Sequence, residues 1–231
     1  MHGWAPASPL HSVMDRIPEP ELMTGAEQVA AYAGADFEQP HQRFIELLQA
    51  CLPQLPGSGT ALDLGCGPGD IACRFARAFP GWRVHGLDGS LPMIQIGERL
   101  VSEARLEARV GLYQCLLPGG AAPQRQYELV YSNSVLHHLA EPAVLWQAVQ
   151  RWSRAGGPVF VMDLRRPETE QELERLVEEY SRGDPEVLRN DFSNSLRAAY
   201  RAEEVQQQLA QAGLGRLNVE VVSDRHWLVW G

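Results

Sequence analysis

Apolar positions follow two patterns along the chain, and the two patterns alternate. Residues 26–54 carry the spacing of an amphipathic helix, and Pro53 with the following PGSG turn marks its end. Short apolar runs then alternate with helical patterns, which favours a parallel sheet covered by helices on both faces. The predicted strands cover residues 61–64, 82–87, 109–115, 127–132 and 159–164.

The last third of the chain predicts further helices and a hairpin. An acidic helix is expected over residues 167–182, and another ends at Gly213, because glycine commonly terminates helices. The final segments, NVEVVSD and RHWLVWG, alternate apolar and polar residues around Ser223 and Asp224. This alternation predicts a terminal antiparallel hairpin.

Length and composition fit one folded domain. With 231 residues, of which 45% are hydrophobic, the chain can bury one sizeable core. We expect a flexible leader over residues 1–22, with Met14 as an alternative start. No apolar run approaches the roughly 18 residues of a membrane span, and the opening residues lack a secretory signal. We therefore expect no association with membranes. Because the four cysteines show neither the spacing of a zinc site nor that of a disulfide framework, we expect a cytoplasmic protein.

The charge pattern excludes several kinds of chemistry. The net charge is −9, and every one of the 20 basic residues is an arginine. Without lysine, the chain has neither a Walker-type phosphate loop nor an amine for Schiff-base catalysis. The acidic balance also disfavours nucleic acid as a partner, although a local arginine patch could overrule it.

The segment ALDLGCGPGD, residues 61–70, places three glycines at the end of a predicted strand. A strand, a glycine loop and a helix bring bare backbone against a ligand at the carboxyl edge of a parallel sheet. Position 70 is an aspartate, whereas the dinucleotide fingerprint has a glycine there. The Asp70 carboxylate would repel a pyrophosphate, so the loop favours a ligand with a positive centre and no phosphate. Asp88 ends the second predicted strand, where an acid accepts hydrogen bonds from ribose hydroxyls.

The order Asp63-x-Gly65-x-Gly67-x-Gly69, followed by Asp88, resembles the motifs of class I S-adenosylmethionine-dependent methyltransferases. Over residues 60–165, SLPMIQIGERL resembles the second helix of that family, YELVYSNSVLHHLAEP its fourth motif and PVFVMDLRRP its fifth strand. The resemblance implies an α/β fold with a seven-stranded, mostly parallel Rossmann-like sheet in the order 3-2-1-4-5-7-6, a terminal antiparallel hairpin and helices on both faces. It also implies a single methyltransferase domain over residues 23–231, in which residues 165–201 cap the substrate.

The resemblance further implies a site for S-adenosyl-L-methionine. Gly65 and Gly67 would pass close to the methionine part, and Asp88 would hold the ribose. Met93 would pack on the adenine, and Tyr32 would act as a lid. The expected cofactor-binding set also includes Asp63, Cys66, Gly69, Gly89, Cys115, Leu116, Ser132, Asn133 and His138.

The adenine side departs from the family pattern. Family members often carry an aspartate just after the third strand, whereas residues 108–127 contain no carboxylate. Cys115 and Leu116 are therefore expected to contact the adenine through backbone groups only.

Two histidines and one aspartate are candidates for acid–base chemistry. Imidazole titrates near neutral pH, so His137 is a candidate general base, and Asp163 at the end of the fifth predicted strand is another. The LHHL segment equally resembles one shared by methyltransferases with unrelated acceptors, which favours a structural or cofactor-side role for its histidines, His138 included. No metal site is expected, because residues 132–139 offer no carboxylate beside the histidines.

Arg165 and Arg166 follow the fifth predicted strand at the expected binding edge. Their guanidinium groups suit an acceptor carboxylate or phosphate, or else they pair with the acidic helix over residues 168–179. The segment RNDFSNSLRAAY adds residues that either contact the acceptor or lie on the surface, namely Asn194, Arg197 and Tyr200.

These observations predict an enzyme that methylates an oxygen, nitrogen, carbon or sulfur atom of a small molecule. Alignment of the reactants supplies up to about 7 to 11 kcal/mol in model reactions, so a general base is optional. Three alternatives are an RNA-modifying methyltransferase, a nicotinamide-dependent oxidoreductase and a non-catalytic scaffold. The acidic charge argues against the first, Asp70 against the second and the intact glycine loop against the third. The sequence is also compatible with a homodimer.

Overall fold

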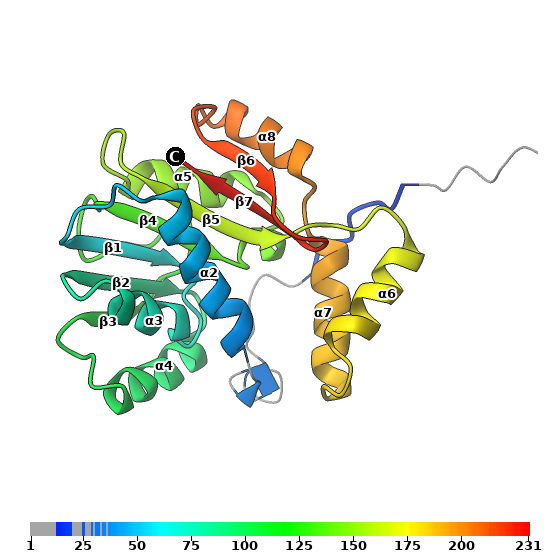
Figure 1. The fold of residues 1–231 in the computed structure, drawn as a ribbon, viewed down its shortest axis with the longest axis horizontal. Helices are drawn as coiled ribbons and strands as arrows, with labels where there is room; N and C mark the ends of the chain where they lie inside the picture. The colour runs from blue at the N-terminus through cyan, green and yellow to red at the C-terminus, as the bar shows by residue number, and fades with distance from the viewer. Residues whose placement is uncertain (1–12, 20–24, 26–28, 30, 33, 36) are drawn as a thin grey trace, which may run out of the picture.

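The computed structural model describes residues 13–19, 25, 29, 31–32, 34–35 and 37–231. Within these residues, one seven-stranded sheet has the order β3-β2-β1-β4-β5-β7-β6 (Figure 1). The first five strands are parallel, and β7 runs antiparallel to both β5 and β6. The predicted strand order and terminal hairpin are therefore confirmed. The strands are β1 Gly59–Leu64, β2 Trp82–Asp88, β3 Val110–Gln114, β4 Leu129–Asn133, β5 Val159–Leu164, β6 Asn218–Val221 and β7 His226–Trp230.

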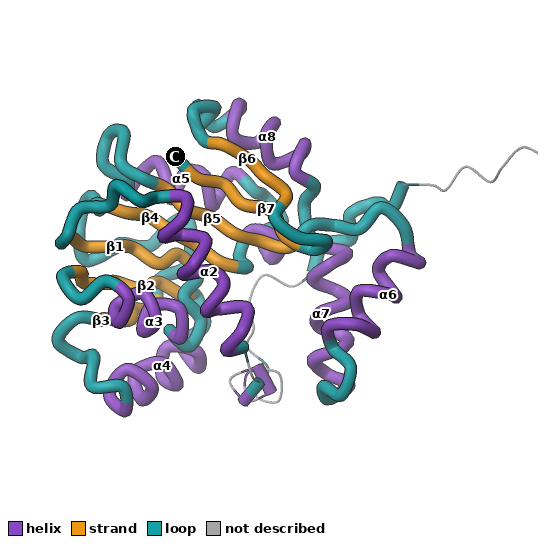
Figure 2. Tube along the Cα trace, in the orientation of Figure 1, coloured by secondary structure: helices purple, strands orange, loops and turns teal. Residues whose placement is uncertain are grey.

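Helices cover both faces of the sheet, as the alternating patterns predict (Figure 2). α2, α3 and α4 pack on one face, whereas α5 and α8 pack on the other. In β1, Ala61 belongs to the first core cluster, while Leu62 and Leu64 belong to the second. None of the described helices is both long and apolar enough to cross a bilayer. The helices are α2 Glu38–Cys51, α3 Asp70–Ala78, α4 Leu91–Glu103, the 3-10 helix η1 Leu136–His138, α5 Ala143–Trp152, α6 Glu170–Tyr180, α7 Glu186–Ala198 and α8 Ala202–Gln211.

The predicted helix over residues 26–54 is wrong as a single element. The chain bends at Ala35, and α2 begins only at Glu38. From there the expected face is correct, because Phe44 and Leu48 are fully buried against the sheet. Several positions before the bend lie outside the described residues.

α6 and α7 lie beyond the carboxyl end of β5, apart from the helices that cover the sheet (Figure 1). Met14 packs against Leu196 of α7 in a third apolar cluster. The N–H of Ile17 donates to the carbonyl of Arg197 at 3.1 Å. Residues 13–19, which fall within the expected leader, therefore lie against α7, and the rest of that leader is outside the described residues.

Candidate active site

The glycine loop between β1 and α3 adopts a backbone conformation that side chains disfavour. Gly65, Gly67 and Gly69 have φ values of +69°, +51° and +78°, all in the left-handed region. A Cβ on Gly65 would lie 2.2 Å from Cγ2 of Val135, so the neighbouring loop leaves no room for a side chain. Gly69 is the N-cap of α3. The three glycines thus form a tight turn from strand to helix.

The carboxylate of Asp88, at the end of β2, holds this loop. One oxygen accepts a hydrogen bond from the N–H of Gly67 at 2.8 Å, and the other accepts one from the N–H of Ser90 at 2.8 Å. The N–H of Cys66 donates to the Leu87 carbonyl at 3.0 Å. Burial raises the pKa of Asp88 more than its two amide donors lower it. A Cβ on Gly67 would meet no atom within 4 Å, so the backbone there is open to a ligand.

A second carboxylate, Asp63, lies in β1 just before the loop and is 2% exposed. Within the described residues, its Oδ2 and the hydroxyl of Tyr131 have no hydrogen-bond partner. The two groups lie close enough to shift each other's pKa, but their geometry falls short of a hydrogen bond. Burial, together with the charge of Asp88, raises the pKa of Asp63 well above its usual value. The Tyr131 hydroxyl lowers the pKa of Asp63, against the larger effect of burial.

Tyr32 lies near the same carboxylates. Burial, with the charges of Asp88 and Asp70, raises the pKa of Tyr32 to about 12. The Tyr32 ring lies 4.7 Å from the ring of Phe37, which in turn lies 5.3 Å from the ring of His41. Nδ1 of His41 is 2.7 Å from Oδ2 of Asp70. This chain of contacts connects the segment before α2 to the first turn of α3.

The residues expected on the adenine side differ in exposure. Met93 is 3% exposed in the first turn of α4. The N–H of Cys115 donates to the carbonyl of Asp88 at 2.8 Å, which places this backbone beside the end of β2. The side chain of Leu116, in contrast, is among the exposed apolar ones, at 58%.

Ser132 and Cys66 are fixed by the protein itself. Ser132 is fully buried, and its hydroxyl donates to the carbonyl of Leu64 at 2.7 Å, which fastens β4 to β1. Burial, with the nearby carboxylates, raises the pKa of the Cys66 thiol well above its usual value, so this cysteine is not an activated nucleophile. Asn133 ends β4, and Gly89 directly follows Asp88.

Asp163, near the end of β5, organises the η1 turn. Its Oδ2 accepts hydrogen bonds from the N–H groups of Val135 and Leu136 at 2.9 and 2.6 Å, and its Oδ1 accepts one from the N–H of Leu164 at 2.6 Å. Oδ1 also lies 2.5 Å from Nδ1 of His137. This contact lowers the pKa of Asp163 and raises the pKa of His137. Burial alone would shift each pKa in the opposite direction. Asp163 is 1% exposed, so protein groups occupy both of its oxygens.

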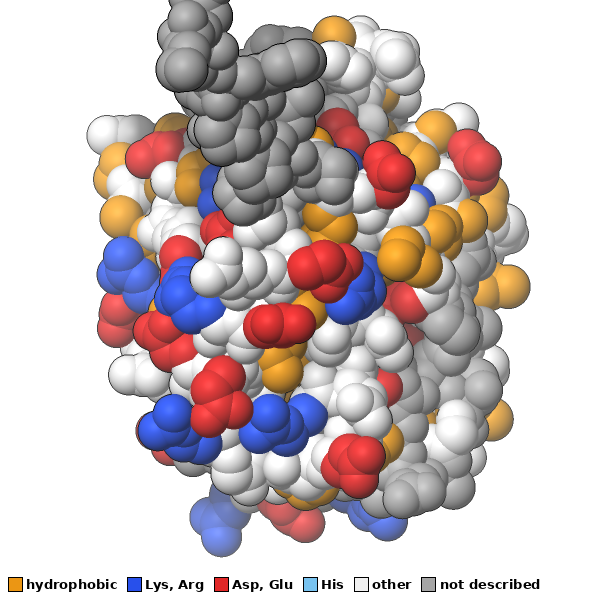
Figure 3. Space-filling model, turned by 90° about the vertical axis from the view of Figure 1, so that its right-hand side faces the viewer, with side chains coloured by type: hydrophobic (Ala, Val, Ile, Leu, Met, Phe, Trp, Pro, Cys, Tyr) orange, Lys and Arg blue, Asp and Glu red, His pale blue; other side chains and the backbone are white. Residues whose placement is uncertain are grey.

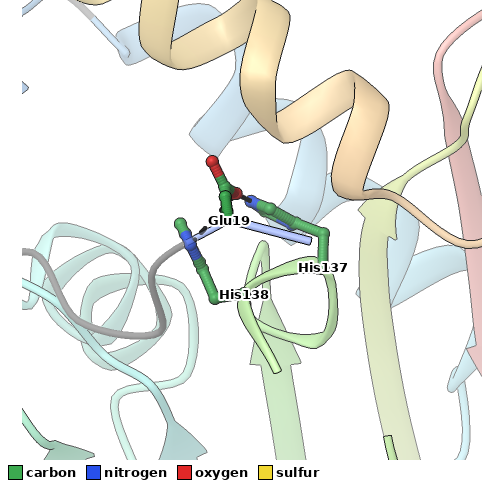
Figure 4. A group of neighbouring side chains, drawn as sticks. All are labelled: Glu19, His137 and His138. Carbon is green, nitrogen blue, oxygen red and sulfur yellow. Dashed lines mark ion pairs between the residues drawn. The ribbon is translucent and has the colours of Figure 1, made fainter. Parts of the chain in front are cut away.

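Glu19 joins the two histidines, a contact that the sequence analysis missed (Figure 4). Oε1 of Glu19 lies 3.5 Å from Nε2 of His137 and 3.2 Å from Nδ1 of His138. The hydroxyl of Ser195, in α7, donates to Oε2 at 3.3 Å. A distant segment thus supplies the carboxylate that residues 132–139 lack, and no local sequence pattern signals it.

The arginines expected on the acceptor side are bound to the protein itself. Arg165 pairs with Glu172 of α6 at 3.5 Å, which is one of its two predicted roles. Arg166 instead lies 2.7 Å from Glu204 and donates to two backbone carbonyls.

Tyr200 and Arg16 connect η1 to the cap segment. The hydroxyl of Tyr200 donates to the carbonyl of Leu139 at 3.1 Å. The guanidinium of Arg16 lies 4.1 Å from the centre of the Tyr200 ring and donates to the same carbonyl at 3.0 Å. Arg197 pairs with an acidic residue of α6, and Asn194 is exposed.

The strand order and the glycine loop together define a Rossmann-like domain, with the carboxylates of Asp63 and Asp88 beside the loop at the carboxyl edge of its sheet. Residues 62–159 match the model of a methyltransferase domain. A trans-aconitate 2-methyltransferase from Paracidovorax citrulli is 31% identical over 137 residues, which cover 59% of this chain and 49% of that protein. A release factor glutamine methyltransferase from Rhodopirellula baltica is 36% identical over 89 residues, which cover 38% of this chain and 30% of that protein. The matches thus span about half the length of these relatives or less.

Solved structures share nearly the whole fold. A SAM-dependent methyltransferase from Aquifex aeolicus has a TM-score of 0.66 at 16% identity, covering 90% of this chain and 98% of that one. The chain therefore shares its fold with these solved structures, and the family model and relatives that its sequence matches are methyltransferases. The residues present would fit S-adenosylmethionine, since they combine open backbone at Gly67 with the carboxylate of Asp88.

Proposed function

We propose that the protein transfers the methyl group of S-adenosylmethionine to a small-molecule acceptor. The observation that carries the proposal is the open backbone at Gly67 beside the carboxylates of Asp63 and Asp88. This edge of the sheet offers hydrogen-bond acceptors and negative charge. S-adenosylmethionine is complementary to it, because it carries ribose hydroxyls, an ammonium and a sulfonium, and no phosphate.

Each part of the cofactor has a counterpart in the chain. We assign the ribose to Asp88, the methionine part to Asp63 and the glycine loop, and the adenine to Met93 and the backbone at Cys115. We also assign Tyr32 to the edge of this site, because the charges of Asp88 and Asp70 act on its hydroxyl. The further proposed members are Gly65, Cys66, Gly67, Gly69, Gly89, Leu116, Ser132, Asn133 and His138.

The mechanism relies on positioning. When bound, the cofactor supplies a methyl group on a positively charged sulfur, which an acceptor lone pair displaces in one step. The chain fixes the two reactants relative to each other, which contributes up to about 7 to 11 kcal/mol in model reactions. In this account Asp163 is a positioning residue, because η1 amides and His137 occupy its oxygens. His137 is the candidate base for a hydroxyl or ammonium acceptor, through the Nε2 atom that faces away from Asp163.

A small-molecule acceptor fits the charge distribution better than RNA does. On the face formed by α6 and α7, arginine side chains alternate with acidic ones (Figure 3). Arg175 pairs with Glu179 and Asp224, and Arg182 pairs with Glu178. Paired arginines leave little net positive potential for a phosphate backbone, and the net charge of −9 opposes it further.

The arginines beside η1 also bear on the acceptor. Arg16, Arg165 and Arg166 all donate to carbonyls or carboxylates of the protein. We therefore infer an uncharged or cationic small molecule rather than a polyanion.

Asp70 argues against the alternative of a nicotinamide dinucleotide. Its carboxylate stands in the first turn of α3, where a pyrophosphate would bind. His41 and Arg74 each lie 2.7 Å from it, and despite burial they lower the pKa of Asp70. A carboxylate that is ionised at neutral pH would repel the pyrophosphate.

The cellular location and the domain bounds of the protein are further parts of the proposal. We propose a cytoplasmic protein, because all four cysteines are free thiols. We also propose one domain over residues 23–231, with residues 165–201 as the cap, since α7 of this segment contacts η1. A homodimer, with which the sequence is compatible, would be tested by sedimentation velocity.

A methyl-transfer assay tests the proposal. Protein and isotope-labelled S-adenosylmethionine are incubated with three acceptor pools from the same cells: small molecules, total RNA and total protein. We expect label in the small-molecule pool, and a loss of about 100-fold for Asp88→Ala, which removes two hydrogen bonds to a charged group. Glu107→Ala changes an exposed carboxylate and serves as the control. Label in RNA or protein alone would contradict the proposal.

A further inference from the structure

Three side chains converge on one point beside η1 (Figure 4). Oε1 of Glu19 lies 3.5 Å from Nε2 of His137 and 3.2 Å from Nδ1 of His138, and all three atoms lie within 4.8 Å of one another. Ligand atoms bound tetrahedrally to one zinc ion are about 3.3 Å apart, given metal–ligand distances of about 2.0 to 2.2 Å. Two of the three separations, 3.2 and 3.5 Å, are close to this value, and the third is at most 4.8 Å.

Two of the three converging atoms are buried and lack a hydrogen-bond partner within the described residues. The side chains of Glu19, His137 and His138 are 10%, 4% and 20% exposed. Within the described residues, Oε1 of Glu19 and Nδ1 of His138 make no hydrogen bond. Buried polar atoms without partners are rare, and both atoms have a lone pair to donate. A cation between them would satisfy both.

The surroundings hold two of the side chains in a ligating orientation. Asp163 lies 2.5 Å from Nδ1 of His137, which leaves Nε2 as the nitrogen that faces Glu19. Backbone amides hold Asp163 in turn, and Ser195 donates to Oε2 of Glu19. A carboxylate behind the second nitrogen of a histidine is the usual partner of a metal-binding imidazole, because it fixes the ring and its tautomer.

We propose that Glu19, His137 and His138 bind one divalent transition-metal ion, with Zn²⁺ the best match. Two imidazoles and one carboxylate suit zinc and its neighbours, whereas Mg²⁺ and Ca²⁺ prefer oxygen ligands alone. Three protein ligands leave a coordination position for water or for an oxygen or nitrogen of another molecule.

The sequence predicts no metal site, because residues 132–139, which include the two histidines, contain no carboxylate. The proposed site differs from that prediction because its carboxylate, Glu19, comes from a distant segment. The ion would fasten the 13–19 segment to η1. It would also occupy Nε2 of His137, which excludes a base role for that atom while the metal is bound. The proposal does not depend on methyl transfer, since metal binding is measured without cofactor or acceptor.

The test is a titration of metal-free, untagged full-length protein. His2 and His11 are replaced by glutamine beforehand, so that histidines outside the cluster near the N-terminus do not contribute. Calorimetry with Zn²⁺ is expected to show one equivalent bound. Co²⁺ is expected to give the intense visible absorption of a four- or five-coordinate site with nitrogen and oxygen ligands.

Matched variants locate the ion. Asp163→Asn changes a residue that contacts the metal ligand His137, and it is expected to weaken Zn²⁺ binding by about 10- to 100-fold. Glu19→Gln and His138→Gln remove a ligand itself and are expected to weaken Zn²⁺ binding by more than that factor. Glu107→Gln and His85→Gln change the same residue types elsewhere and should bind as the parent protein does. Circular dichroism verifies that each variant is folded.

Two results would overturn the proposal. One is the absence of Zn²⁺ and Co²⁺ binding by the folded parent protein. The other is unchanged affinity in folded Glu19→Gln and His138→Gln variants. In either case the contact between Glu19 and His138 is an ion pair only.

Discussion

Asp88 and Asp163 both lie near the carboxyl end of a strand, and both hold a loop by accepting hydrogen bonds from backbone amides. Their pKa values nevertheless shift in opposite directions. Asp88 accepts two backbone amides, and burial still raises its pKa. Asp163 accepts three close backbone amides and contacts His137, and its pKa is lowered. Asp88, which has fewer protein donors, can therefore still accept a hydrogen bond from a ligand, whereas the hydrogen bonds of Asp163 are made to the protein. The predictions below test this comparison.

The largest effect is expected for Asp163→Asn. In either orientation of the new amide, its NH2 group faces a backbone N–H that donated to the carboxylate, so that hydrogen bond is lost. We expect the free energy of unfolding to fall by about 3 kcal/mol, as for other broken buried networks, and by about 1 kcal/mol for Asp88→Asn, whose side chain is less buried. Urea unfolding followed by tryptophan fluorescence measures both. Equal losses would show that the two acids play equivalent structural roles.

The glycine loop offers a matched pair. Gly65→Ala is expected to cost about 3 kcal/mol of stability, because its Cβ would clash with Val135 and its φ is left-handed. Gly67→Ala should cost only about 1 kcal/mol, since its Cβ meets no atom, yet it should weaken cofactor binding by filling open space. Denaturation and calorimetry separate the two effects. A larger stability loss for Gly67→Ala would contradict the assignment of open space there.

His226 allows a test of pH dependence. Burial and the charge of Arg225 lower its pKa from 6.5 to about 4, against the opposite effects of Asp163 and Asp224. The unfolded state therefore binds the proton more readily, so the stability that neutral His226 contributes is present above pH 6.5 and is lost as the pH falls toward 4. Between about pH 7 and about pH 5 the loss is about 2 kcal/mol. Urea unfolding at both pH values should show a smaller loss in His226→Gln, and an identical loss would contradict the pKa assignment.

The smallest effect is expected for Asp63→Asn. Burial and Asp88 raise the pKa of Asp63, so its ionised form destabilises the fold at neutral pH in the absence of a cofactor. Removal of the charge should raise the free energy of unfolding by about 1 kcal/mol and weaken the binding of S-adenosylmethionine. Thermal unfolding without and with the cofactor measures both. A loss of stability in the cofactor-free variant would show that the fold needs this charge.

Much of the fold and the turn of the glycine loop could be predicted from the sequence, because they depend on local patterns. The turn from β1 to α3 needs glycines at fixed spacing, and alternating strand and helix patterns predict a parallel sheet. The observed ends of some strands differ from the predicted ones. Tyr127, predicted to lie in the fourth strand, forms only an isolated bridge with Ser153, and β4 begins at Leu129.

The contacts around η1 and the segment that follows β5 could not be predicted in the same way. Glu19 meets His137 and His138 only because residues 13–19 pack against α7. Arg166 likewise finds its partner in α8, outside the acidic helix that follows it in sequence. Such contacts depend on the packing of distant segments and leave no periodic or spacing signal in the chain.

Calorimetric titration with S-adenosylmethionine tests the central claim most directly. For the wild-type protein we expect micromolar affinity, about −8 kcal/mol, and for Asp88→Ala an affinity weaker by about 100-fold, with NADH as the comparison ligand. Undiminished binding of S-adenosylmethionine by Asp88→Ala, or tighter binding of NADH by the wild-type protein, would contradict the account of the carboxylate-held glycine loop.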